Sequence, residues 1–194
     1  AVSARPDHYA PSLDALRVGE PTYVRGVTSG YHMAVAAKRP IPWEPVLAYC
    51  LWAVQPRPFA QPPRPAPLGR DPSWSWVHGT VLDLLRAGLD RDARVIPLEC
   101  RDAAWLVLSV LARDPSSPTP EQEARVKDFA SSGINCTRGR ALELAIEYGV
   151  WVREASGPDA AASFDLIPEV RTLLEELLDP VREPSPSVRA VVGT

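Results

Sequence analysis

The sequence predicts an all-α fold with one Pro-rich surface loop. The helices form either a helical repeat of the irregular α-solenoid kind or a helical bundle. Apolar residues recur at helical spacing wherever their pattern is clear, and no stretch alternates with a period of two between turn residues. Proline and glycine stand where helices would begin and end. We treat residues 1–194 as a single helical domain. Because the chain starts at Ala1 and stops soon after Pro186 opens a helix, we interpret it as an excerpt of a longer polypeptide.

Five predicted helices have clear boundaries, and they cover 43–55, 74–88, 99–113, 138–154 and 168–178. In the first, apolar side chains repeat at i, i+3, i+4 and i+7 from Trp43. Gly88 is placed to end the second helix. The third helix is apolar nearly all round, which indicates burial on several sides. Its members Trp105, Leu108 and Leu111 therefore belong to the predicted core.

The fourth helix, over 138–154, is capped by Asn135 or Thr137 and closed by Gly157. Its predicted inner face consists of Leu142, Ala145, Ile146, Gly149 and Val152. Trp151 falls on the charged face instead, so it either covers a neighbouring helix or belongs to a contact surface.

Three further segments are less regular. Thr119 and Gln122 form a capping box, and a short polar helix should follow to about Phe129. A potential helix over 22–37 is interrupted by Gly26, Ser29 and Gly30. Residues 56–72 contain seven prolines and predict an extended surface connection. Within this connection, residues 61–70 could adopt polyproline II and be bound by an aromatic-lined groove, or could simply stiffen the loop.

The composition excludes several classes of protein. A formal net charge of −3 gives the chain no overall attraction for nucleic acid or for an anionic membrane surface. The longest apolar run, from Ala103 to Ala112, is well short of the roughly 18 residues that a membrane span needs. Cys50, Cys100 and Cys136 are odd in number and widely spaced, so they predict neither a disulfide framework nor a zinc site. A reducing cytoplasm is the simplest setting.

Cys136 carries a catalytic hypothesis. It lies next to a predicted helix N-terminus with Arg138 and Arg140 nearby, a setting that lowers the pKa of a thiol and favours a nucleophile. The alternative is an ordinary small residue in a first turn, because the sequence offers no recognisable set of His and Asn or Asp partners. The second interpretation is the favoured one.

The sequence predicts no metal, no cofactor and no enzyme activity. His8, His32 and His78 have no ligand spacing with one another or with the cysteines. Glu143 and Glu147 stand one turn apart, but the Glu-x-x-His helix that a carboxylate metal site needs is absent, so a solvated face is favoured. Phosphate-binding loops and hydrolase motifs are also absent from the sequence.

Residues 167–180, followed by Ser187-Val188-Arg189-Ala190, resemble one HEAT repeat. The first helix, the Asp-Pro turn and the Val-Arg opening of the second helix are present, whereas the extra residues between the two helices depart from the pattern. A second resemblance is carried by residues 135–143 together with 43–47, which are similar to an internal region of long, poorly characterised bacterial multidomain proteins, some of them linked with phage defence. The first resemblance implies a HEAT-like pair of helices, and the second implies helical architecture and a large parent protein.

The leading functional hypothesis is a non-catalytic helical scaffold or recognition module of a larger bacterial protein, which binds a protein partner or other domains of the same chain. The alternative is a helical nucleic-acid-binding region of a defence-type protein, in which basic residues near one helix junction contact phosphates. An enzyme domain with Cys136 as nucleophile ranks third. The candidate interaction residues are Trp151, Arg138, Arg140, Arg125 and Lys127.

Overall fold

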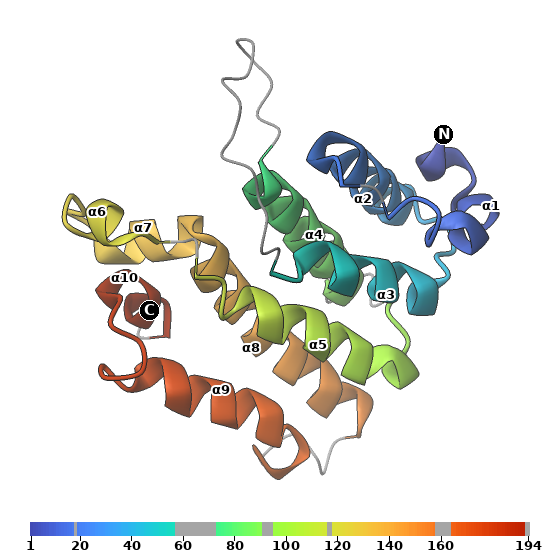
Figure 1. Ribbon diagram of the computed structural model, residues 1–194. Helices are drawn as coiled ribbons and strands as arrows, with labels where there is room; N and C mark the ends of the chain where they lie inside the picture. The colour runs from blue at the N-terminus through green and yellow to red at the C-terminus, as the bar shows by residue number, and fades with distance from the viewer. Residues whose placement is uncertain (18, 57–72, 91–94, 116–117, 158–163, 193–194) are drawn as a thin grey trace. The chain divides into compact units, whose positions relative to one another are not determined.

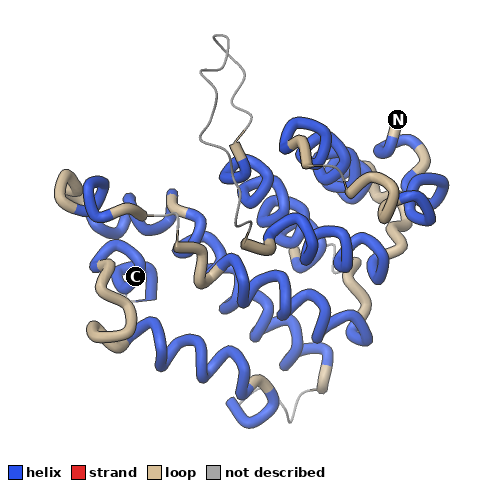
Figure 2. The backbone as a smooth tube through the Cα atoms, in the orientation of Figure 1, coloured by secondary structure: helices blue, strands red, loops and turns tan. Residues whose placement is uncertain are grey.

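The protein is all-helical. The computed structural model describes residues 1–17, 19–56, 73–90, 95–115, 118–157 and 164–192, and within these ranges every regular element is a helix (Figure 2). None of the helices in the described ranges is long and apolar enough to cross a bilayer. The predicted Pro-rich connection, including the polyproline segment 61–70, lies outside the described residues apart from Pro56.

The contacts gather in two compact units, Ala1–Val107 and Leu108–Thr194. The single helical domain over residues 1–194 stays a prediction. Each unit is described by itself. The first unit contains η1 (Val2–Ala4), α1 (Pro6–Tyr9), η2 (Ala10–Ser12), α2 (Pro21–Ala36), α3 (Trp43–Val54), α4 (Trp74–Leu89) and η3 (Leu98–Cys100). Helix α5 (Arg101–Leu111) crosses the boundary, and the second unit continues with α6 (Pro120–Glu123), α7 (Phe129–Asn135), α8 (Thr137–Ala155), η5 (Phe164–Leu166), α9 (Pro168–Leu178) and α10 (Pro186–Val192) (Figure 1).

Helix α2 is continuous through all three residues that interrupt its pattern, so the expected break is wrong. Tertiary packing outweighs the low helix propensity of glycine. Val24 and Ala34 are fully buried, and the Tyr31 hydroxyl donates to the Pro6 carbonyl oxygen at 3.2 Å. Gly30 lets η1 approach the helix, because a Cβ at that position would lie 2.6 Å from the Cβ of Val2.

Gly88 does not end α4 as predicted. The helix continues to Leu89, and Gly88 is a close-contact position inside it. A Cβ there would lie 2.7 Å from Cγ1 of Ile96 and 2.7 Å from Cη2 of Trp43. The missing side chain therefore lets Trp43, which is 3 % exposed, pack against the backbone of α4.

Helix α5 is buried on one face only. Its buried residues Ala104, Val107, Leu108 and Leu111 stand at i, i+3, i+4 and i+7. Leu108 and Leu111 are therefore buried as predicted, but Trp105 is half-buried and Leu106 is 51 % exposed. The prediction for Trp105 is wrong because apolar composition all round a helix does not guarantee neighbours all round it.

The capping box at Thr119 is confirmed, but the helix it starts is a single turn. Helix α6 ends at Glu123, and a second short helix that the sequence analysis did not predict, α7, begins at Phe129. Asp128 is its N-cap, and its carboxylate accepts a hydrogen bond from the Ser131 backbone N–H at 3.1 Å. The expected helix therefore ends at Glu123 and not near Phe129, and α7 begins where that helix was expected to end.

Helix α8 is capped by neither predicted residue. Cys136 is the N-cap, and its Sγ accepts a hydrogen bond from the Gly139 N–H at 3.3 Å. At the other end, Gly157 has the positive φ of 104° that a closing glycine adopts, as predicted. The predicted inner face is confirmed at Leu142, Ala145, Gly149 and Val152, but Ile146 is 40 % exposed, so its assignment to that face is wrong. The buried face extends instead over Leu144, Tyr148 and Trp151, because neighbours cover α8 on that side.

The short helices of the second unit are held by direct backbone contact. A Cβ on Gly139 would collide with the carbonyl oxygen of Gly133, and a Cβ on Gly133 would collide with the carbonyl oxygen of Ser187. Helix α10 therefore packs against α7, and α7 against the start of α8, at distances that only glycine allows (Figure 1).

Candidate recognition cleft

A cleft of about 520 Å³ lies between α6, α7 and the first residue before α8. This volume falls within the range of ordinary ligand sites. We name it the α6–α7 cleft and define it by its lining residues, which are Pro118, Gln122, Arg125, Val126, Asp128, Ser131, Ser132, Asn135 and Cys136. All of them belong to the second unit.

The polar side chains of the α6–α7 cleft are positioned by local hydrogen bonds. Oε1 of Gln122 accepts from the Thr119 N–H at 2.8 Å, and the Gln122 N–H donates to Oγ1 of Thr119 at 3.3 Å. Nδ2 of Asn135 donates to the Ser131 carbonyl oxygen at 2.7 Å. Together with the Asp128 cap, these bonds fix three side chains to the backbone of the two short helices.

A buried polar network ties the cleft to the segment before α10. The Glu123 carboxylate on α6 accepts from the Ser185 hydroxyl and, at 3.2 Å, from the Ser187 hydroxyl. Ser185 caps α10, because its Oγ accepts from the Val188 N–H at 3.1 Å. Glu183 accepts from the Ser185 N–H at 2.9 Å. A single helical turn is unstable by itself. The hydrogen bonds of Glu123 therefore anchor α6 to the segment before α10.

The structure separates the four predicted basic residues. Arg138 points into the network and forms an ion pair with Glu183 at 2.6 Å, with its side chain 16 % exposed. Arg140 is half-buried and already has an interaction. Arg125 and Lys127 are exposed, and Arg125 lines the cleft. The four therefore do not form one open basic surface.

Trp151 is 4 % exposed and packs against Tyr148, with ring centroids 5.6 Å apart. Of the two roles that the sequence left open, this burial fits the role of covering neighbouring helices. A side chain this buried offers no area to a partner, so Trp151 does not belong to the cleft surface.

The thiol of Cys136 does not have the lowered pKa that its helix position suggested. The pKa is raised, because burial of the side chain outweighs the lowering effects of the Gly139 N–H and of Arg138. The side chain is 7 % exposed at the edge of the cleft. A raised pKa leaves less thiolate at neutral pH, which weighs against a nucleophilic role.

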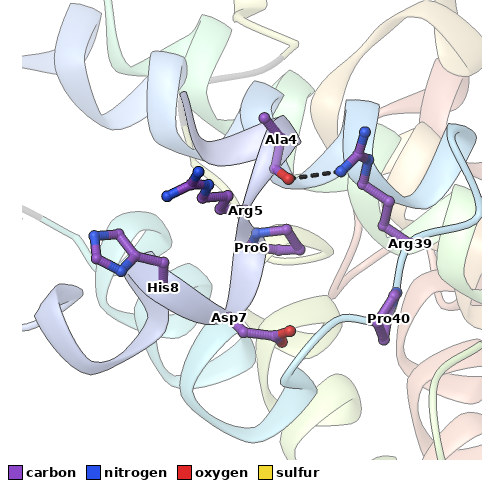
Figure 3. A pocket seen from close by; sticks show the side chains of 7 residues that line it. All are labelled: Ala4, Arg5, Pro6, Asp7, His8, Arg39 and Pro40. Carbon is purple, nitrogen blue, oxygen red and sulfur yellow. Dashed lines mark hydrogen bonds between the residues drawn. The ribbon is translucent and has the colours of Figure 1, made fainter.

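A second cleft, of about 350 Å³, occurs in the first unit beside α1 and is lined by Ala4, Arg5, Pro6, Asp7, His8, Arg39 and Pro40. The Arg39 guanidinium donates to the Ala4 carbonyl oxygen at 2.6 Å. In Figure 3, the Arg5 and His8 side chains lie on one side of Pro6, and Arg39 lies on the other. These cations do not converge on one point, and Arg39 is already bonded to the Ala4 carbonyl oxygen, so we assign no anion site there.

Sequence analysis identified Arg125 but missed the other polar residues of the α6–α7 cleft. Asp128, Ser131, Ser132 and Asn135 depend on α7, a helix with little apolar periodicity. One signal was available: Asp128 is of a residue type that is strongly preferred at the N-cap, and it stands directly before Phe129. Among the described residues, no group of three or more His, Cys, Asp or Glu side chains could hold a metal ion.

Comparison with protein-family models, with curated proteins and with solved structures finds no match to this chain.

Proposed function

We propose that this chain is a non-catalytic helical recognition module, which binds a protein partner, or another domain of the same polypeptide, through the α6–α7 cleft. The observation that carries this proposal is the cleft itself. Its polar side chains are fixed in place by capping hydrogen bonds, and its Arg125 has no ion-pair partner among the described residues. Pre-positioned groups lose little conformational freedom on binding, which favours recognition.

The charge of the α6–α7 cleft favours a protein over nucleic acid. Arg125 and the neighbouring Lys127 are accompanied by Asp128 in the cleft and by the exposed Glu121 on α6. Phosphate backbones are bound by surfaces with a clear excess of positive charge. The pairing of Arg138 with Glu183 removes a further cation from the surface that the nucleic-acid hypothesis needs.

The raised pKa and the burial of Cys136 support the non-catalytic part of the proposal. A HEAT-like arrangement of the last two helices is consistent with the contacts of α9 with α10 and of both with α8. The residues that depart from the HEAT pattern include Glu183 and Ser185, which belong to the network behind the cleft. We infer that these residues serve to fix the recognition surface.

Site-specific photo-crosslinking in cells of the source organism tests the proposal. A diazirine-bearing amino acid replaces Ser131, which is exposed and lines the cleft, and a matched control places it at Arg171 on α9. We expect crosslinks to a defined polypeptide from position 131 and not from position 171. R125E should reduce the yield, and K127E, which changes a nearby exposed cation outside the cleft lining, should reduce it less.

Three outcomes would overturn the proposal. They are crosslinks to nucleic acid, crosslinks of equal yield from positions 131 and 171, and the absence of any crosslink from position 131.

A further inference from the structure

We propose that the ligand of the α6–α7 cleft is an extended peptide segment with an acidic side chain between small apolar ones. This inference rests on the proposed function and names the chemistry of the partner. It follows from three properties of the cleft: the hydrogen-bonding atoms that its own folding leaves unused, the mixture of donors and acceptors among them, and the apolar residues beside them.

The hydrogen bonds that position the cleft side chains use one polar atom of each. Gln122 uses its Oε1, Asp128 its Oδ1 and Asn135 its Nδ2. Within the described residues, Nε2 of Gln122, Oδ2 of Asp128 and Oδ1 of Asn135 have no other partner. Each side chain is therefore fixed and still has a polar atom for a ligand.

The unused atoms include both donors and acceptors. Gln122 provides an N–H donor, Asp128 and Asn135 provide oxygen acceptors, and the hydroxyls of Ser131 and Ser132 serve as either. An extended peptide backbone has alternating N–H and C=O groups, so it can satisfy both kinds. A phosphodiester backbone has acceptors only, so it would leave the oxygens of Asp128 and Asn135 without a donor, whereas the N–H groups of a peptide backbone satisfy them. The mixture therefore favours a peptide over a nucleic acid.

Arg125 specifies the acidic side chain. It is exposed, lines the cleft and has no partner among the described residues. A guanidinium presents paired N–H donors that match the two oxygens of a carboxylate. The apolar lining of Pro118, Val126 and the buried Cys136 lies in the same cleft and suits small aliphatic side chains next to the acidic one.

The test is an NMR titration of the ¹⁵N-labelled 194-residue protein with capped pentapeptides. One peptide has a central glutamate flanked by valines, and its matched control has glutamine in place of the glutamate. We expect the glutamate peptide to shift the Ser131 and Ser132 amides and the Gln122 and Asn135 side-chain amides. Its Kd should be about 1.4 to 5 times lower than that of the glutamine peptide, the range that an exposed ion pair provides.

Two variants separate the cleft from general charge. R125Q should abolish the difference in Kd between the glutamate and glutamine peptides, and K127Q should preserve it. Equal effects of R125Q and K127Q would overturn the inference, as would equal Kd values for the two peptides with the wild-type protein. Shifts of the same amides by a short oligothymidylate, with a lower Kd than the glutamate peptide, would overturn it in favour of nucleic acid.

The outcomes also distinguish this inference from the proposed function. If Arg125-dependent crosslinks to a polypeptide form from position 131 while the two peptides bind alike, the recognition module stands and the acidic ligand is wrong. If neither peptide shifts the cleft amides and position 131 crosslinks no polypeptide, both are wrong.

Discussion

The guanidinium of Arg138, at the start of α8, donates to Oε2 of Glu183 at 2.6 Å, and the Glu183 side chain is 3 % exposed. Glu183 also accepts from the Ser185 N–H, and its carbonyl oxygen accepts from Arg189. This pair joins the start of α8 to the segment that leads into α10, and through Ser185 it reaches Glu123 on α6. The ion pair therefore belongs to the network that anchors α6, one of the helices that line the α6–α7 cleft.

Removing the arginine of this pair should destabilise the second unit strongly. R138M leaves the Glu183 carboxylate buried without its cation, and breaking a buried pair in this way costs about 3–5 kcal/mol. The double variant R138M/E183L should recover part of this loss, because no uncompensated charge remains. Urea denaturation followed by circular dichroism measures both free energies of unfolding. In the control, R171M breaks an exposed pair with Glu175 and should leave stability nearly unchanged.

Two glycine-to-alanine substitutions should have opposite effects. G139A places a Cβ against the carbonyl oxygen of Gly133 and should destabilise the protein by about 1–3 kcal/mol, the usual effect of overpacking. G26A lies on an exposed part of α2 where a Cβ would meet nothing within 4 Å. It should stabilise the protein by roughly 0.5–1 kcal/mol. A melting temperature that G139A leaves unchanged or raises would contradict the packing described for α7 and α8, and one that G26A lowers would contradict the open surface at Gly26.

Helix α5 allows a comparison between neighbouring leucines. Leu108 is fully buried, so L108A should cost about 2–5 kcal/mol through lost burial and a residual cavity. Leu106 is 51 % exposed, and L106A should change the free energy of unfolding by less than about 0.5 kcal/mol. Equal losses in chemical denaturation would show that both faces of α5 are covered.

Stability should fall in the alkaline range. Burial raises the pKa of the Cys50 thiol from 9.0 to about 12, and burial, with a smaller contribution from Asp7, raises the pKa of Tyr31 from 10.0 to about 12. A group whose pKa is higher in the folded state stabilises that state fully below its unfolded pKa, and the stabilisation is lost as pH rises toward the folded value. The free energy of unfolding should therefore decrease from about pH 9 toward pH 12.

The variants C50A and Y31F provide the check on this alkaline loss. Each should make the decrease in the urea-derived free energy shallower between about pH 8 and pH 11. A slope that neither variant alters would show that these groups ionise as readily in the folded protein as in the unfolded chain.

The helices that apolar periodicity marks could be predicted from the sequence, and the ones held by tertiary contact could not. Helix α3 follows its pattern from Trp43 to Val54, and α9 follows its own from Pro168 to Leu178. Helix α7 has no such pattern, since Ser131, Ser132 and Gly133 have low helix propensity. It forms because Asp128 caps it and because Gly133 allows α10 to approach closely.

The same reason explains which parts of the candidate site were missed. Charge alone identified Arg125 as a candidate contact, and it equally identified Arg138, whose buried partner Glu183 is 45 residues away in the sequence. Trp151 appeared on the charged face of its helix because the width of the buried face depends on how many neighbours α8 has. Such long-range pairings have no local signature in a single sequence.

Competition in the crosslinking experiment decides whether the α6–α7 cleft binds a protein through an acidic segment. The partner polypeptide is crosslinked from position 131, and the crosslink yield is measured at increasing concentrations of the glutamate peptide or of the glutamine peptide. We predict that the glutamate peptide lowers the yield at a lower concentration than the glutamine peptide does, and that R125Q removes this difference. A crosslink yield that neither peptide lowers would contradict binding of the partner through an acidic segment.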